Sequence, residues 1–279
     1  MSIFENKMRK IAKGTNAYLN RFLIKKNFNS PLIKPMKYAL FSGGKKFRSK
    51  IIVDTGKIFN IDYSLLIALS AAVECIHSYS LIHDDLPCMD NDDFRRGKIS
   101  THKKFGESTA VLAGNSLLTS AFEILSERKL KLKDKIKLEL LHMLASCSGH
   151  LGIAGGQYLD LNFEHKKVSK LQLMEMQNKK TGKLFSFCCS SSAIIKEKKL
   201  SMKRDLSQIG LQIGLLYQIS DDLIDVRGNS NKAGKPTKRD VKRGKATLVN
   251  LLGYNNLLEF AYSLKNKLVN KIKKYGTKS

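Results

Sequence analysis

Proline is almost absent from this chain. Only four prolines occur in 279 residues, and none lies between Pro87 and Pro236. Because proline interrupts helices and marks loops and turns, its absence over such a distance favours long helices over a β architecture with many turns. Apolar residues recur three and four positions apart in the segments 65–80, 111–125 and 206–219, as in amphipathic helices. We therefore expect an all-α, single-domain bundle of about ten or more helices over residues 1–279, in which each apolar face packs against another helix.

The chain is strongly basic. Fifty Lys and Arg residues stand against 24 Asp and Glu, which gives a formal net charge of +26. Such an excess is typical of proteins that bind polyanions or anionic membranes, and also of lysine-rich proteomes. Here the cations are spread along the chain, without a basic stripe interleaved with aromatic residues and without a nucleic-acid motif. We interpret most of them as solvated helix faces and expect no nucleic-acid partner, while a few could converge on a phosphate-bearing ligand.

The cysteines and the amino terminus indicate a cytoplasmic protein. The five cysteines are odd in number and form no Cys-x-x-Cys pair, which argues against a disulfide framework or a zinc site. The segment 1–14 lacks the apolar run of a signal peptide. The most apolar stretch, 64–83, is long enough for a membrane span, but it contains Glu74, His77 and His83. We expect it to be a buried core helix, without stable insertion into a membrane.

Two clusters of acidic residues interrupt this basic chain. One lies in the segment 81–93 and the other in the segment 217–225, and each ends an apolar helical run. Carboxylates at such places are costly unless a cation or solvent compensates them. In a helix, Asp221 and Asp225 share one face one turn apart, with Asp222 about 100° round the axis. The first cluster consists of Asp84, Asp85, Asp90, Asp92 and Asp93.

Hard carboxylate oxygens suit Mg²⁺ better than zinc. Magnesium usually takes one or two carboxylates and completes its octahedron with water and substrate phosphate, so such a site implies a phosphorylated ligand. Either cluster alone could be a carboxylate-rich helix cap or a solvated turn. Two clusters, each at the end of a core helix, favour metal binding.

Cations that could complement such a ligand fall at specific places. Gly43 and Gly44 precede Lys45 and Arg48, and glycines let backbone approach an anion. A second basic pair, Arg95-Arg96, follows the first acidic cluster directly. Planar guanidinium groups can bind phosphate oxygens bidentately; the alternative is a surface ion-pair network that contributes little.

Six motifs occur in a fixed order over essentially the whole chain. They are GGKKFRSK, AVECIHSYSLIHDDLPCMDNDDFRRGKISTH, GGQYLDL, NKKTGKLF, GLLYQISDDLIDVRGN and GKPTKRDVKRGKAT. In this combination the chain resembles the short-chain trans-polyprenyl diphosphate synthases, most closely the bacterial members that make farnesyl diphosphate. The resemblance implies an isoprenoid-synthase helical bundle, usually homodimeric, in which two aspartate-rich helix ends face each other across a deep central cavity. It also implies three Mg²⁺ ions bound with the diphosphate.

The resemblance assigns a role to each candidate site residue. The implied Mg²⁺ ligands are Asp84, Asp90 and Asp221, with Asp85, Asp222 and Asp225 in supporting roles. The residues implied to hold isopentenyl diphosphate are Lys45, Arg48, His77 and Arg96. Those implied to hold the allylic diphosphate are Arg95, Lys180, Lys235 and Lys245, while Thr181 and Gln218 would lie beside the developing cation. Among these, Arg95, Lys180, Thr181 and Gln218 are the expected catalytic residues.

The implied reaction is the Mg²⁺-dependent, head-to-tail condensation of isopentenyl diphosphate with dimethylallyl or geranyl diphosphate. Ionising an allylic diphosphate separates a carbocation from a multiply charged leaving group, so one end of the site must stabilise anionic charge and the other must be dry and apolar. The second substrate's double bond attacks the cation, so no protein nucleophile is needed. We expect this mechanism of ionisation, condensation and elimination to give farnesyl diphosphate.

Product length is expected to depend on Tyr79 and its neighbour Ser80. Tyr79 lies five positions before the first aspartate, and one turn of helix would place its ring on the wall along which the prenyl chain grows. An aromatic residue there resembles the enzymes that make a fifteen-carbon product. The alternative is an ordinary core tyrosine.

Three departures from the family pattern qualify this interpretation. Asn115 stands where relatives usually have aspartate, KATLVNLLG lacks the customary proline, and the chain stops at Ser279 where relatives usually continue into another short basic helix. The missing C-terminal helix is expected to affect closure of the site, not the metal ligands. The alternatives are a geranylgeranyl diphosphate synthase, a terpene cyclase, a weakly active regulatory subunit, and, from the net charge alone, a nucleic-acid-binding protein.

Overall fold

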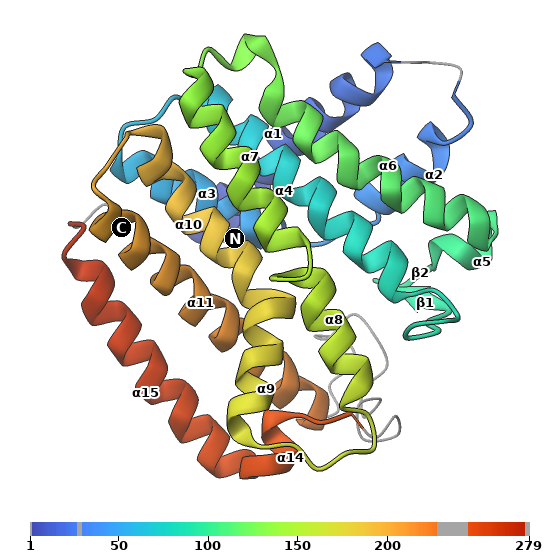
Figure 1. The fold of residues 1–279 in the computed structure, drawn as a ribbon, viewed down its shortest axis with the longest axis vertical. Coiled ribbons are helices and arrows are strands. Elements are labelled where there is room, and N and C mark those ends of the chain that lie inside the picture. Colours follow the sequence, from blue (N-terminus) through green and yellow to red (C-terminus); the bar gives the residue numbers. More distant parts are fainter. Residues whose placement is uncertain (1, 27–29, 228–244, 277–279) are drawn as a thin grey trace. The chain divides into compact units, whose positions relative to one another are not determined.

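A computed structural model of the chain describes residues 2–26, 30–227 and 245–276, and these residues are overwhelmingly helical (Figure 1). The expected all-α class is confirmed. The chain divides into two compact units, the first comprising Met1–His142 with Ile194–Glu197 and the second Met143–Ala193 with Lys198–Ser279. That the whole chain forms one domain stays a prediction.

The first unit is built around one long apolar helix. Helix α4 begins after Asp62, whose carboxylate accepts hydrogen bonds from the backbone of Ser64 and Leu65, and its residues are mostly buried against α1, α3 and α6. By length and composition α4 could cross a membrane, but 83% of its most apolar window is buried within the protein, so the prediction of a buried core helix is confirmed. The elements of this part of the chain are α1 (Ile3–Lys26), α2 (Ile33–Leu40), α3 (Phe47–Ile58), α4 (Tyr63–Asp84), β1 (Phe94–Arg95), β2 (Lys98–Ile99), α5 (Thr101–Phe105), α6 (Glu107–Ser126), the 3₁₀ turn η1 (Arg128–Leu130) and α7 (Asp134–Ser148).

The second unit contains the longest helix of the described chain, α11, which packs against α15 and against a π-helical turn, η2. Helix α9 starts at a capping box formed by Ser169 and Gln172. The elements are α8 (Ile153–Asn162), α9 (Lys170–Gln177), η2 (Asn178–Gly182), α10 (Lys183–Ile195), α11 (Leu200–Arg227), α14 (Leu248–Leu252) and α15 (Tyr254–Lys273).

Glycines let the backbone of η2 lie close to its neighbours. A Cβ atom on Gly156 of α8 would come within 2.1 Å of the Lys180 backbone nitrogen, and one on Gly214 of α11 would come within 2.7 Å of the Gly182 Cα atom. Only glycine permits such approaches. The turn that carries Lys180 and Thr181 is therefore fixed by backbone packing on two sides.

One local feature differs from the sequence-based expectation. Residues 94–99 form a small antiparallel hairpin, with Phe94 opposite Ile99, although the sequence shows no alternating strand pattern. Its strands are two residues long, too short for a periodic signal. The predicted site residue Lys235 lies in the segment 228–244, outside the described residues.

Candidate active site

The first acidic cluster surrounds the carboxyl end of α4. The helix ends at Asp84, and the chain folds back so that the Asp90 and Asp92 backbone N–H groups donate to the carbonyl oxygens of Asp84 and Asp85, at 2.8 and 3.1 Å. Asp84 and Asp90 are half-buried, whereas Asp85 and Asp92 are buried. Because the carboxyl end of a helix carries partial negative charge, carboxylates gathered there favour binding of a cation.

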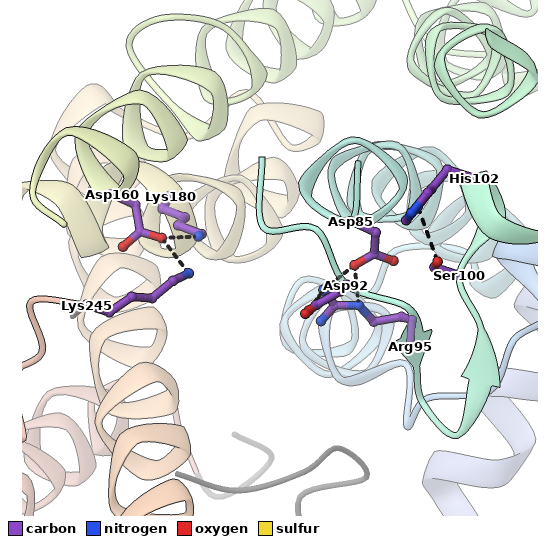
Figure 2. A network of polar contacts seen from close by, with 8 residues as sticks. All are labelled: Asp85, Asp92, Arg95, Ser100, His102, Asp160, Lys180 and Lys245. Atoms are coloured by element: carbon purple, nitrogen blue, oxygen red, sulfur yellow. Dashed lines mark hydrogen bonds and ion pairs between the residues drawn. The ribbon is translucent and has the colours of Figure 1, made fainter. Parts of the chain in front are cut away.

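Arg95 provides a positive charge that partly neutralises the aspartates of the first acidic cluster. From β1 its Nε donates to Asp85 Oδ1 at 2.8 Å, and its Nη2 contacts both Asp85 and Asp92, the latter at 3.2 Å (Figure 2). Burial raises the pKa of the Asp85 carboxyl to about 6, while the Arg95 charge opposes that rise. The structure thus places an expected metal-supporting aspartate in direct contact with an expected diphosphate-binding arginine.

A basic cluster lies beside α4 around His77, about two helical turns before Asp84. Arg96 Nη1 donates to the Gly43 carbonyl oxygen at 2.7 Å, and Arg96 Nη2 lies 3.3 Å from His77 Nε2. Burial first, and then the positive charges of Arg48 and Arg96, hold the pKa of His77 well below its usual range. Since a guanidinium only donates, the neutral ring accepts at Nε2. The predicted isopentenyl diphosphate residues His77, Arg48 and Arg96 therefore share one electrostatic environment, and Lys45 is exposed on the adjoining loop.

In the second unit, one buried carboxylate holds two predicted substrate lysines. Asp160 Oδ2 accepts from Lys180 Nζ at 2.6 Å and from Lys245 Nζ at 3.2 Å (Figure 2). Burial alone would raise the pKa of Asp160, but the two ammonium groups outweigh it and lower the pKa. The residues come from α8, η2 and the segment before α14, and are 20 and 85 positions apart.

The second acidic cluster lies at the carboxyl end of α11. Asp221 is exposed, while Asp222 and Asp225 are buried. Gln218 Nε2 donates to Asp222 Oδ1 at 3.0 Å, and the Thr181 hydroxyl donates to Gln218 Oε1 at 3.3 Å. A hydrogen-bonded chain therefore connects η2 with Asp222 of α11.

Tyr79 lies on α4 with 8% of its surface exposed, and its ring meets that of His83 edge to face, with centroids 5.3 Å apart. Ser80 is buried and its hydroxyl donates to the His77 carbonyl oxygen at 3.0 Å. Both residues thus belong to the helix that ends in the first acidic cluster. Their effect on product length stays a prediction.

The donor set fits magnesium held together with a phosphate ligand. Among the residues that the structure describes, no three His, Cys, Asp or Glu side chains form a ready-made metal cage. The acidic clusters instead offer single carboxylates at helix ends, and Mg²⁺ characteristically combines one or two carboxylates with water and substrate phosphate. In the first unit the carboxylates that could hold Mg²⁺ are those of Asp84 and Asp90, supported by Asp85; in the second unit that of Asp221 could do so, supported by Asp222 and Asp225.

Sequence reasoning missed the partners of the predicted residues. The sequence gives no reason to select Asp160 as a site residue; it marks Glu74 only as a charge within an apolar segment and Asp92 only as part of the first cluster. Asp160 lies in the GGQYLDL motif and Glu74 three residues before His77, so their motifs were visible. A single acidic residue in a helix carries no local pattern that reveals a distant lysine.

The whole chain can be compared with known proteins. The model of the family described as "Polyprenyl synthetase" matches residues 29–277. The farnesyl diphosphate synthase of Escherichia coli (strain K12) is 40% identical over 253 residues, which cover 90% of this chain and 85% of that protein. The chain therefore belongs to the polyprenyl synthetase family, as the ordered motifs predict.

Solved structures agree with this assignment. An FPP/GFPP synthase from Zymomonas mobilis, solved in the apo form, matches with a TM-score of 0.88 and 36% identity, covering 100% of this chain and 95% of that chain. A geranyltransferase from Helicobacter pylori, complexed with magnesium and isoprenyl diphosphate, matches with a TM-score of 0.83 and 32% identity over 98% of this chain and 92% of that chain. The isoprenoid-synthase fold predicted from the motifs is confirmed.

Proposed function

We propose that this protein is a farnesyl diphosphate synthase, which joins isopentenyl diphosphate head to tail to dimethylallyl and then to geranyl diphosphate. In this member of the family, two helices, α4 and α11, end in clusters of carboxylates, and the chain also carries two separate groups of cations. This combination is the observation that carries the proposal. A protein that binds two diphosphates, and must ionise only one of them, needs such an arrangement.

In this function the first unit binds the homoallylic substrate. Lys45, Arg48 and Arg96 bind the diphosphate of isopentenyl diphosphate, and the neutral imidazole of His77 lies beside them. A fixed diphosphate holds the double bond in position for attack, which converts a bimolecular step into one within a bound complex.

The allylic diphosphate is bound by Arg95, Lys180 and Lys245, and by Lys235, which lies outside the described residues. These cations stabilise the negative charge that develops as the carbon–oxygen bond breaks. Thr181 and Gln218, joined by their hydrogen bond, present oxygen dipoles to the allylic cation. The displaced diphosphate accepts the proton that is lost when the new double bond forms.

The carboxylates of both clusters fit Mg²⁺, and we propose three ions bound with the diphosphate. When bound, the metal neutralises the leaving group and lowers the barrier to its departure. The Helicobacter pylori neighbour complexed with magnesium supports this assignment. We further propose a cytoplasmic homodimer, without nucleic-acid partners and without stable membrane insertion, in keeping with the burial of α4.

The test is incubation of the purified protein with isopentenyl and dimethylallyl diphosphates and Mg²⁺, followed by chromatography of the dephosphorylated products. A fifteen-carbon alcohol is expected. A twenty-carbon product would favour the geranylgeranyl diphosphate synthase alternative. No condensation, with the substrates still bound, would favour a regulatory subunit.

A further inference from the structure

A buried ion pair lies next to the proposed isopentenyl diphosphate site without belonging to it. Lys46 Nζ is 3.2 Å from Glu74 Oε2, and only 4% of each side chain is exposed. The other Glu74 oxygen accepts from the Ser49 hydroxyl at 2.8 Å, and Lys46 Nζ also donates to the Leu40 carbonyl oxygen at 3.1 Å. Both charges are thus paired and hydrogen-bonded, which is what burial of charged groups requires.

The pair closes a turn that the backbone would not choose by itself. Lys46 has φ 51° and ψ 44°, the left-handed conformation, in which a residue with a Cβ atom is disfavoured. Gly43 and Gly44 before it both have φ near +100°. A turn with three positive φ values in four residues persists only where surrounding contacts hold it, and the Lys46 side chain supplies such contacts to the end of α2 and to α4.

The turn 43–46 contacts the side chains that are proposed to bind the diphosphate. The Gly43 carbonyl oxygen accepts from Arg96 Nη1 at 2.7 Å, and the same guanidinium lies 3.3 Å from His77 Nε2. A Cβ on Gly44 would come within 2.6 Å of that guanidinium, so the turn and Arg96 are closely packed. Glu74 lies one helical turn before His77 on α4, so the ion pair fixes the turn against the face of α4 that carries the histidine.

We propose that the Lys46–Glu74 pair is a positioning element of the isopentenyl diphosphate site: it holds the turn 43–46 in the conformation that presents Lys45 and orients Arg96. The proposal rests on the proposed function. Neither side chain touches the substrate, since both are buried; they act through the turn. The pair therefore determines affinity for isopentenyl diphosphate and leaves the lysines proposed to bind the allylic diphosphate, Lys180 and Lys245 in the second unit, unaffected.

The test compares Glu74→Gln and Lys46→Met with the wild type. We expect KM for isopentenyl diphosphate to rise on the order of tenfold or more, with kcat and KM for the allylic substrate changing less than about threefold. Binding of isopentenyl diphosphate alone, measured by calorimetry, should weaken in parallel. The matched control is Lys50→Met, which removes another buried, paired lysine, one whose side chain pairs with Asp54 on α3. Its backbone N–H donates to the Lys46 carbonyl oxygen, and the substitution keeps that bond.

A double variant separates positioning from stability. Each single change leaves an unpaired buried charge or polar group and should lower Tm, whereas Lys46→Met with Glu74→Leu removes both charges and should recover most of the loss. We expect the double variant to keep the raised KM for isopentenyl diphosphate in spite of its recovered Tm. Lys46→Arg, which retains a cation for Glu74, should keep a near wild-type KM.

Two results would overturn the inference. One is a double variant in which Tm and KM for isopentenyl diphosphate recover together, since the pair would then be structural only; the other is a wild-type KM in folded Glu74→Gln. If the single variants do not fold, Lys46→Arg and the double variant still decide the question. Failure of the proposed function is distinct, because it would appear in the wild type itself, as no condensation or as a product of another length.

Discussion

Several buried carboxylates of the described chain are held by cations from other elements. Glu74 pairs with Lys46, Asp85 with Arg95, and Asp160 with two lysines. Removing one partner of such a pair leaves a desolvated charge, which is more costly than the net contribution of the intact pair. Asp85 and Asp160 therefore determine where Arg95, Lys180 and Lys245, the cations proposed to bind the allylic diphosphate, lie.

Asp160 gives a prediction with a defined pH dependence. Its folded pKa is lowered, so its contribution to the free energy of unfolding is present above the unfolded value of about 4 and is lost as pH falls through the folded pKa. We expect Asp160→Asn to destabilise the protein by about 1–3 kcal/mol at pH 7, and by less as pH falls below about 4. Urea unfolding between pH 3 and pH 7 measures this, with Glu175→Gln, an exposed member of an i,i+4 pair, as control. A difference that stayed constant down to pH 3 would contradict the assignment.

Tyr79 gives a prediction about product length. If its buried ring ends the space available to the growing chain, Tyr79→Ala should yield prenyl alcohols longer than fifteen carbons, because about one aromatic ring of volume becomes free. Tyr79→Phe, which keeps the ring, is the control and should retain the wild-type product. Chromatography of the dephosphorylated products distinguishes these outcomes. An unchanged fifteen-carbon product from a folded Tyr79→Ala variant would show that the ring is only a core residue.

At the scale of elements, the sequence pattern predicts helices well and their contacts poorly. The apolar period identifies α4, and the Ser169 capping box marks the start of α9, because both signals are local. The hairpin 94–99 and the π-helical turn η2 leave no periodic trace, since they are short and are imposed by tertiary packing. The two aspartate clusters were predicted because several acids stand together; Asp160 and Glu74 were missed because their partners lie far away in sequence.

In the turn between α2 and α3, the adjacent residues Gly43 and Gly44 allow the effects of two alanine substitutions to be compared. Both have φ near +100°, so alanine at either position introduces backbone strain of about 1–3 kcal/mol. Only at Gly44 would the added Cβ also overlap the Arg96 guanidinium, whereas nothing lies within 4 Å of a Cβ on Gly43. We expect Gly44→Ala to raise KM for isopentenyl diphosphate at least several-fold more than Gly43→Ala. Equal KM values in steady-state assays of the two variants would refute the argument.

The packing of α8 on η2 predicts an effect on the other substrate. Gly156→Ala would push its Cβ into the Lys180 backbone, displacing the turn that carries Lys180 and Thr181. We expect a loss of stability of about 1–3 kcal/mol and a fall in kcat/KM for the allylic diphosphate on the order of tenfold or more. Gly149→Ala is the control, because its Cβ would meet only the Ala145 carbonyl oxygen, at 3.3 Å. Kinetics with geranyl diphosphate and thermal melting measure the two effects, and a Gly156→Ala variant that behaved like the control would contradict them.

The protein as a whole is strongly positive, whereas the local charge at the proposed metal ligands is negative. The chain carries +26 overall, which attracts diphosphates over a distance, yet the proposed metal ligands are clusters of carboxylates at helix ends. A positive protein repels free Mg²⁺, and single carboxylates bind it weakly. Metal and diphosphate should therefore bind together, each supplying ligands or charge that the other needs.

This coupling can be measured without turnover, by thermal melting with Mg²⁺, with inorganic pyrophosphate, and with both. Each ligand alone should raise Tm by little, whereas both together at about 100 times the dissociation constant should contribute about 2.7 kcal/mol and raise Tm by roughly 5–10 °C. Asp84→Asn and Asp221→Asn, one in each unit, should each abolish most of that rise, and EDTA should remove it from the wild type. Asp93→Asn is the control from the same acidic segment, because Asp93 is 56% exposed and pairs with Lys103 at the surface. If Asp221→Asn kept the full shift, the α11 cluster would take no part in binding the metal pyrophosphate, and its proposed role as a metal site would be wrong.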